Sequence, residues 1–255
     1  MVLALVAAYL IYTYILGDPS HFVDQDPANQ PLSGDYLGTV YKGGYAVVIL
    51  LSLQIILITF ILERLISLQQ ASGRGSSRQW LQQLKQKLAY HDLEGGIQSC
   101  DQQGGSLGNV VRNGLSAYQR MQEESHLEEG ERVQTLQREL DESTHLEMPV
   151  LQRNMAIIST IASIATLIGL LGTVLGMIKA FAALARVGAP DAVALANGIS
   201  QALVTTALGI STAAVAIIFY NYLTSRIDRL IFDIDEATYA LVQSFKTRHA
   251  STATA

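Results

Sequence analysis

The sequence predicts an all-α integral membrane protein with three long transmembrane helices and a helical region outside the membrane. Charged residues make up only 15% of the 255 residues, whereas soluble globular chains carry about a quarter. Uncharged runs of 20, 25 and 34 residues occupy 43–62, 154–178 and 192–225. About 20 apolar residues suffice to cross a bilayer core of roughly 30 Å, so composition alone supplies three spans.

Composition also excludes several other classes of protein. A single cysteine and five prolines exclude disulfide-rich and collagen-like chains. A formal charge of −5 provides no basic surface for nucleic acid. There is no P-loop motif and no metal-ligand spacing among the histidines, so we expect neither an enzyme nor a bound metal or cofactor. The histidines are His21, His91, His126, His145 and His249.

The N-terminal residues 1–16 are also uncharged, but they reach only roughly 24 Å as a helix, which is marginal for a crossing. A cleaved signal peptide is disfavoured because no Lys or Arg precedes Lys42. We expect a short hydrophobic helix that either crosses the membrane or lies in its plane.

The distribution of Lys and Arg predicts the orientation of the spans. Residues 64–153 carry ten of these cations and the chain after 225 carries four, whereas 17–42 and 179–191 carry one and two. Residues 64–153 and the chain after 225, which are rich in Lys and Arg, are therefore expected on the cytoplasmic side. The expected order is an N-terminal hydrophobic or interfacial helix (1–16), an outer segment (17–42), a transmembrane helix (43–64), a cytoplasmic helical region (65–153), a transmembrane helix (154–178), an outer turn (179–191), a transmembrane helix (192–225) and a cytoplasmic tail (226–255).

The cytoplasmic region is predicted to form amphipathic helices. Apolar residues recur every three or four positions from Trp80 to Leu88 and from Val133 to Leu146. We expect Pro149 to kink or restart the second helix. Glu63 and Arg64 end the first span, where we expect an interfacial anchor or a salt bridge to a neighbouring subunit or partner.

The second and third spans are rich in Ala, Gly, Ser and Thr, unlike the bulky first span. Small residues mark helix–helix contacts in bilayers, because they let backbones approach closely. Tight packing alone would also explain a single motif with this spacing. The expected packing residues are Gly169, Gly172, Gly176, Gly198, Ala202 and Gly209.

Hydroxyl and amide side chains form one stripe on each of these spans. Ser159, Ser163, Thr166 and Thr173 follow helical spacing on the second span, and Gln201, Thr205 and Thr212 do so on the third, with Thr206 adjacent. Such stripes suggest the lining of a hydrated path or a surface for another helix. Neither uncharged run contains Asp, Glu, Lys, Arg or His, so either no ion passes or a partner helix supplies the titrating carboxylate.

Two runs in these spans resemble a known family. Residues 168–181 (IGLLGTVLGMIKAF) and 198–210 (GISQALVTTALGI) are similar to the signatures of the MotA/TolQ/ExbB proton channel family. The three-span plan resembles ExbB and TolQ more than the four-span MotA. Residues 17–22 and 36–44 further resemble ExbB-type proteins of Bacteroidetes-like bacteria.

The resemblance implies a homopentameric ring in the bacterial inner membrane, with its C-terminus in the cytoplasm. An ExbD-like single-span partner would supply the titrating Asp, and a TonB-like protein would transmit energy from the proton motive force to outer-membrane transport. The chain is also expected to bind other copies of itself and membrane lipid. A TolQ-like role in envelope maintenance and a non-conducting scaffold are the alternatives, and H⁺ and Na⁺ both remain open as the ion.

The resemblance also implies site residues. Thr173 and Thr206 correspond to pore-facing threonines, and Thr166, Thr205 and Gln201 are the further expected lining residues. The family often has Glu where Gln201 stands. Because Gln cannot titrate, this departure shifts the expected protonation onto the partner's Asp.

Overall fold

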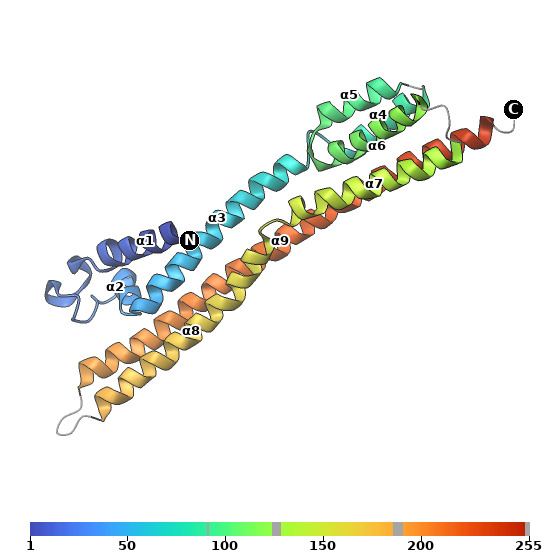
Figure 1. Cartoon of the computed structure of the whole chain (residues 1–255). Coiled ribbons are helices and arrows are strands. Elements are labelled where there is room, and N and C mark those ends of the chain that lie inside the picture. Colours follow the sequence, from blue (N-terminus) through green and yellow to red (C-terminus); the bar gives the residue numbers. More distant parts are fainter. Residues whose placement is uncertain (91, 124–128, 186–190, 253–255) are drawn as a thin grey trace. The chain divides into compact units, whose positions relative to one another are not determined.

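The computed structural model describes residues 1–90, 92–123, 129–185 and 191–252 (Figure 1). It is helical throughout these ranges apart from turns and one isolated bridge between Phe22 and Pro31. The prediction of an all-helical chain is confirmed. The elements are α1 (Val2–Leu10), the π-helix η1 (Ile11–Leu16), the short 3₁₀ helices η2 (Pro19–His21) and η3 (Val23–Gln25), α2 (Tyr36–Tyr41), α3 (Tyr45–Ala71), α4 (Ser77–Ala89), α5 (Leu93–Gln103), α6 (Gly105–Glu123), α7 (Glu129–Gln152), α8 (Met155–Leu184) and α9 (Ala192–Thr252).

Three helices within the described ranges are long and apolar enough to cross a membrane. They are Tyr45–Ala71, Gly130–Leu184 and Ala192–Lys246. The chain divides into two compact units. The first unit holds Met1–Glu63 and Asn154–Asn221, and the second holds Arg64–Arg153 and the chain from Tyr222 onward.

The first unit has a core of three helices. Leu50 of α3, Ala165 of α8 and Ala213 of α9 are buried together. The contact between α8 and α9 is much closer than a contact between large side chains, because glycines and alanines face one another along it. An added Cβ at Gly176 would lie 2.7 Å from the carbonyl oxygen of Gly198.

The segment before α3 folds on itself and packs on α9. The Phe22 side chain is 2% exposed and lies edge-on to the Tyr41 ring. Lys42 Nζ donates to the carbonyls of Pro27 and Ala28, each at 3.0 Å. Gln30 donates from Nε2 to Asn197 Oδ1 of α9 at 3.2 Å. These contacts fix the outer segment against the start of α9.

A contact between a histidine and a carboxylate, together with a helix cap, adds order to this outer segment. His21 Nδ1 lies 2.7 Å from Asp35 Oδ2, while the other Asp35 oxygen accepts the backbone N–H groups of Leu37 and Gly38 at the start of α2. The hydrogen bond from Gly38 and the nearby His21 hold the pKa of Asp35 below its usual range. The carboxylate is therefore ionised at neutral pH and caps α2.

The second unit is a helical bundle with an apolar core. Trp80, Leu81, Leu84 and Leu88 are buried on one face of α4, which confirms the predicted amphipathic helix. The Trp80 indole donates to the carbonyl of Ser99 at 3.1 Å. Burial raises the pKa of the Cys100 thiol to about 12, so this cysteine is almost entirely protonated, and poorly nucleophilic, at neutral pH.

The helix predicted from Val133 to Leu146 forms, but its burial and its C-terminal end differ in part from the prediction. Val133, Leu136 and Leu140 are buried as expected, but Leu146 is 69% exposed. The helix also does not end at Pro149, because α7 continues to Gln152. The break falls at Asn154, whose left-handed φ of 61° ends a right-handed helix.

The close contact between α8 and α9 makes Gly176 intolerant of a side chain. We expect Gly176→Val to lower the free energy of unfolding by about 1–3 kcal/mol, because the added atoms overlap backbone that cannot move aside. Thermal unfolding of the detergent-solubilised protein measures this change. Gly130→Ala is the control, since an added Cβ there meets nothing within 4 Å. Equal midpoints for the two variants would contradict the role of this contact.

Candidate functional site

The candidate site lies where α8 and α9 run antiparallel in the first unit. Gly169 lies against Gly209, and Gly176 lies against Gly198 and Ala202. Gly172 lies against the side chain of Thr205, with no room for a Cβ. All six residues that the sequence assigned to packing are therefore in or beside this contact: Gly169, Gly172, Gly176, Gly198, Ala202 and Gly209.

Two threonine hydroxyls meet at one edge of this contact. Thr173 Oγ1 of α8 lies 2.6 Å from Thr206 Oγ1 of α9. Each hydroxyl is also within reach of the Gly169 carbonyl oxygen, at 3.2 Å from Thr173 and 3.3 Å from Thr206. Both side chains are half-buried. Because a hydroxyl donates and accepts at once, the pair can relay a proton without becoming charged.

Thr205 lies inside the protomer instead of on an open surface. Its side chain is 0% exposed, and its hydroxyl donates to the carbonyl of Gln201 at 2.8 Å. Thr212 of the same predicted stripe is 1% exposed and donates to the carbonyl of Leu208. Thr205, which was expected to line a path, is therefore interior within the protomer, because the stripe packs against α8 and its hydroxyls bond to their own helix.

Gln201 is also covered within the protomer. It is 8% exposed and accepts a hydrogen bond from Lys179 Nζ of α8 at 2.9 Å. Gly44, which immediately precedes α3, lies against the same amide. Lys179 thus binds a neutral partner on the neighbouring helix.

The threonine pair and the Lys179–Gln201 pair lie on opposite edges of the α8–α9 contact. At about 100° per residue, Thr173 and Lys179 are about 60° to either side of Gly176 on α8. On α9, Gln201 and Thr206 are about 140° apart. Gly44 covers the edge with Gln201, so the outer segment and the threonine pair occupy different sides of the helix pair.

The remaining predicted site residues lie in separate places. Thr166 is exposed on the same side of α8 as Thr173 and donates to the carbonyl of Ala162 at 3.2 Å. In the first unit, Glu63 accepts a hydrogen bond from Asn154 at 3.2 Å. In the second, Arg64 is 2% exposed and donates to the carbonyl of Val150. Arg64 thus differs from the expected interfacial anchor, because it is buried and binds a carbonyl near the end of α7.

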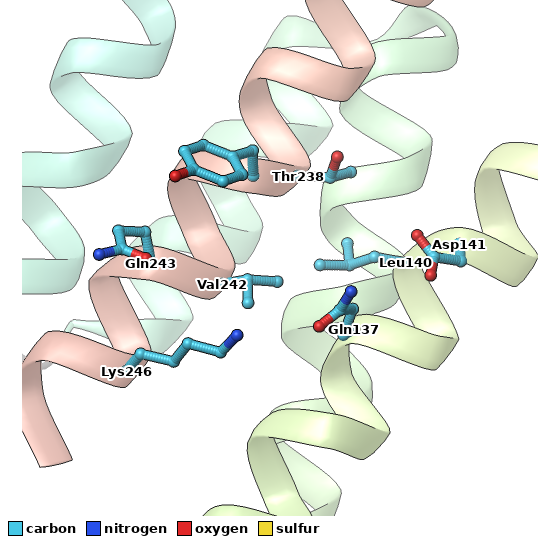
Figure 2. A pocket seen from close by; sticks show the side chains of 8 residues that line it. Gln137, Leu140, Asp141, Thr238, Val242, Gln243 and Lys246 are labelled. Carbon is cyan, nitrogen blue, oxygen red and sulfur yellow. The ribbon is translucent and has the colours of Figure 1, made fainter.

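The second unit has a polar groove between α7 and α9 (Figure 2). Its lining combines a carboxylate, an ammonium group, amides and hydroxyls. No group of three or more metal-binding side chains occurs in the part of the chain that the structure covers. We assign this groove no part in the site, which belongs to the first unit. The groove is lined by Gln137, Leu140, Asp141, Thr238, Tyr239, Val242, Gln243 and Lys246.

The fold and the site together define a multi-pass membrane protein with a pair of hydroxyls on an exposed edge of two spans. Residues 107–236, about half of the chain, match the model of the MotA/TolQ/ExbB proton channel family. The chain therefore belongs to the MotA/TolQ/ExbB proton channel family, which confirms the resemblance of its sequence motifs. The matched region includes all of α8 and the part of α9 that carries Thr206.

Several curated proteins are similar to parts of this chain. A biopolymer transport protein of Synechocystis sp. named ExbB-like 3 is 33% identical over 112 residues, which are 43% of this chain and 53% of that protein. TolQ of the Tol-Pal system of Pseudomonas aeruginosa is 28% identical over 122 residues, 48% of this chain and 53% of TolQ. The biopolymer transport protein ExbB of Aquifex aeolicus is 36% identical over 83 residues, 32% of this chain and 56% of that ExbB. The chain spans about half the length of these relatives.

Sequence reasoning missed the contact between Lys179 and Gln201. The signal was available in part, because Lys179 is the first charge after 25 uncharged residues and Gln201 is the longest polar side chain near the start of the third span. The helical period of the sequence could not predict this contact. It gives the face of each helix on which Lys179 and Gln201 lie, but not the position of α9 along α8, on which the contact depends.

The Lys179–Gln201 hydrogen bond is testable by a double-mutant cycle. We expect Lys179→Met and Gln201→Leu to couple by about 1 kcal/mol in the free energy of unfolding, because one ion–amide hydrogen bond joins them. Unfolding in detergent measures the four proteins. Lys179→Met combined with Thr212→Val is the control and should be additive, and full additivity for the first pair would refute the contact.

Proposed function

We propose that this chain is the ExbB-like subunit of a proton-driven motor in the bacterial inner membrane. With an ExbD-like partner, it uses the proton motive force to energise TonB-dependent transport across the outer membrane. Membership of the proton channel family and relatives named ExbB support this function. The observation that carries it is the hydroxyl pair of Thr173 and Thr206 in two uncharged runs, 154–178 and 192–225, that contain no Asp, Glu, Lys, Arg or His.

The proposed topology follows the distribution of Lys and Arg. Residues 17–42 and the 179–191 turn face the periplasm, whereas 65–153 and the C-terminus face the cytoplasm. In this orientation α8 runs outward and α9 runs inward. Residues 1–16 belong to the apolar elements and pack through Tyr12, whose ring stacks on Tyr41 at 4.7 Å between centroids.

In the proposed complex, five copies form a ring around the partner's helix. A protonated carboxyl group on that helix is neutral and passes apolar walls, whereas a carboxylate in hydrocarbon costs several kcal/mol. The Thr173–Thr206 pair is where an ionised carboxylate finds hydrogen-bond donors. Each proton that crosses releases about 2.3 kcal/mol per 100 mV of membrane potential, which is available for moving the partner.

A TolQ-like role in envelope maintenance is the second candidate, and relatives named TolQ favour it. Complementation separates the two roles, because the same motor would serve different outer-membrane systems. We expect this chain and its cognate partner to restore TonB-dependent uptake in a bacterium that lacks ExbB. Restoration of outer-membrane integrity in a strain that lacks TolQ, without restoration of uptake, would assign the Tol role instead.

The hydroxyl pair is tested by proton flux into liposomes that contain the chain and its partner. We expect Thr173→Val and Thr206→Val each to lower flux about tenfold or more, since removal of a relay hydroxyl costs at least about 1.4 kcal/mol at the barrier. Thr173→Ser keeps the hydroxyl and should keep most of the flux.

Thr160→Val is the matched control for this experiment, because Thr160 is an exposed threonine of α8 whose hydroxyl bonds only its own helix. Its flux should equal that of the unmodified protein. Equal flux in all four variants would reject the assignment of the pair, and absence of flux from the unmodified complex would favour the scaffold.

A further inference from the structure

The short helix α2 turns its apolar side outward. Tyr36 and Leu37 are 84% and 43% exposed. Gly38 is buried instead, and an added Cβ there would lie 2.9 Å from the carbonyl oxygen of His21. At about 100° per residue, Tyr36, Leu37 and Val40 fall within an arc of about 100° whose centre is about 150° from Gly38. Because a surface helix in water turns its apolar side toward the core, the outer side of α2 is suited to contact something other than water.

Two further tyrosines are exposed at the outer ends of the neighbouring apolar elements. Tyr14 of η1 is 72% exposed, and Tyr45, the first residue of α3, is 82% exposed. The Tyr12 hydroxyl donates to the carbonyl of Tyr41 at 3.1 Å, which joins η1 to the end of α2. Tyrosine is enriched where the hydrocarbon core of a membrane meets the headgroups, because its ring is apolar and its hydroxyl is polar. The tyrosines thus place α2 at the outer boundary of the apolar elements.

The exposed side of α2 is continuous along the chain with a surface that suits lipid. α2 ends four residues before α3 begins. Ile49 follows Tyr45 by one turn of α3 and is also exposed, at 46%. Because α3 is apolar and long enough to cross a membrane, its exposed apolar side chains contact acyl chains. A bilayer that surrounds this end of α3 also reaches the helix that immediately precedes it.

The outer segment lacks the charge that binding to an anionic surface requires. Residues 17–42 contain four Asp and one Lys. The ammonium group of that Lys42 is already bound to the carbonyls of Pro27 and Ala28. Segments that bind anionic lipid present clusters of exposed Lys and Arg. The outer side of α2 therefore suits zwitterionic phospholipid, which it contacts through rings and aliphatic groups and not through charge.

We propose that α2 is an interfacial anchor that lies in the outer headgroup layer of the membrane that α3 crosses. Tyr36, Leu37 and Val40 contact zwitterionic phospholipid, and Gly38 faces the rest of the outer segment. Interfacial helices bury their apolar side about 5–10 Å into the boundary between headgroups and acyl chains. The anchor fixes the level at which the outer segment meets the membrane, and it does not require proton transport.

The depth of α2 is measured with single spin-labelled cysteines in the full-length chain, reconstituted in phosphatidylcholine vesicles. We expect the ratio of collisions with oxygen to collisions with a water-soluble nickel complex to be at least about threefold higher at Tyr36→Cys and Leu37→Cys than at Ala28→Cys, because a layer some 5–10 Å deep admits oxygen and excludes nickel. Ala28 is the matched control, since it is exposed and its backbone N–H binds the exposed Asp26 carboxylate. The native Cys100 is 1% exposed and its pKa is raised, so it takes up little label.

Three outcomes would overturn the anchor. A ratio at positions 36 and 37 equal to that at 28 would place α2 in water. Magnetic broadening between labels on different copies would assign this surface to a second copy of the chain. A higher ratio that appears only after phosphatidylglycerol is added would assign the contact to charge.

A second pair of variants tests whether the apolar side holds α2 in the headgroup layer. We expect Tyr36→Asp to lower the collision ratio at Leu37→Cys to the value at Ala28→Cys, because an ionised carboxylate resists burial in this layer. Tyr36→Trp, which is also favoured at the interface, should keep the ratio unchanged. An unchanged ratio in Tyr36→Asp would reject the anchor. These measurements need no proton flux, so failure of transport would reject the proposed function without deciding this inference.

Discussion

The close contact of α8 and α9 is the constraint on which the rest of the first unit depends. In a bilayer, helices gain little from leaving one lipid environment for another, so they associate through van der Waals contact and hydrogen bonds. Glycines at 169, 172, 176, 198 and 209 bring the two backbones together. Only at this separation can short threonine side chains on the two helices reach one another.

Two cations near the ends of the uncharged runs donate hydrogen bonds to neutral groups of the same chain. Lys179 binds the amide of Gln201, and the buried Arg64 binds the backbone carbonyl of Val150. Each cation satisfies a polar group that would otherwise be costly to bury. Because Lys179 turns away from the threonine pair, its charge does not lie on the edge that we assign to proton transfer.

The sequence was sufficient to predict the helices, since long uncharged runs and amphipathic spacing report burial in lipid or in a bundle. It was insufficient for the polar residues of the third span. A helical period places Gln201, Thr205 and Thr212 on one face, but it does not say what covers that face. In the structure α8 and the segment before α3 cover much of it, so an apparent lining is interior. The end of α7 could not be predicted from the sequence either. Pro149 is the obvious helix-breaking residue in this region, but the backbone turns at Asn154, whose positive φ the sequence does not indicate.

The shared carbonyl of Gly169 allows the threonine pair two hydrogen-bond arrangements. Thr173 can donate to Thr206, which then donates to Gly169, or the two roles can be exchanged, and the two distances to the carbonyl are nearly the same at 3.2 Å and 3.3 Å. In either arrangement both O–H groups are engaged within the chain, one with the other threonine and one with the Gly169 carbonyl. One hydroxyl must therefore rotate out of the pair before it can donate a hydrogen bond to any other group.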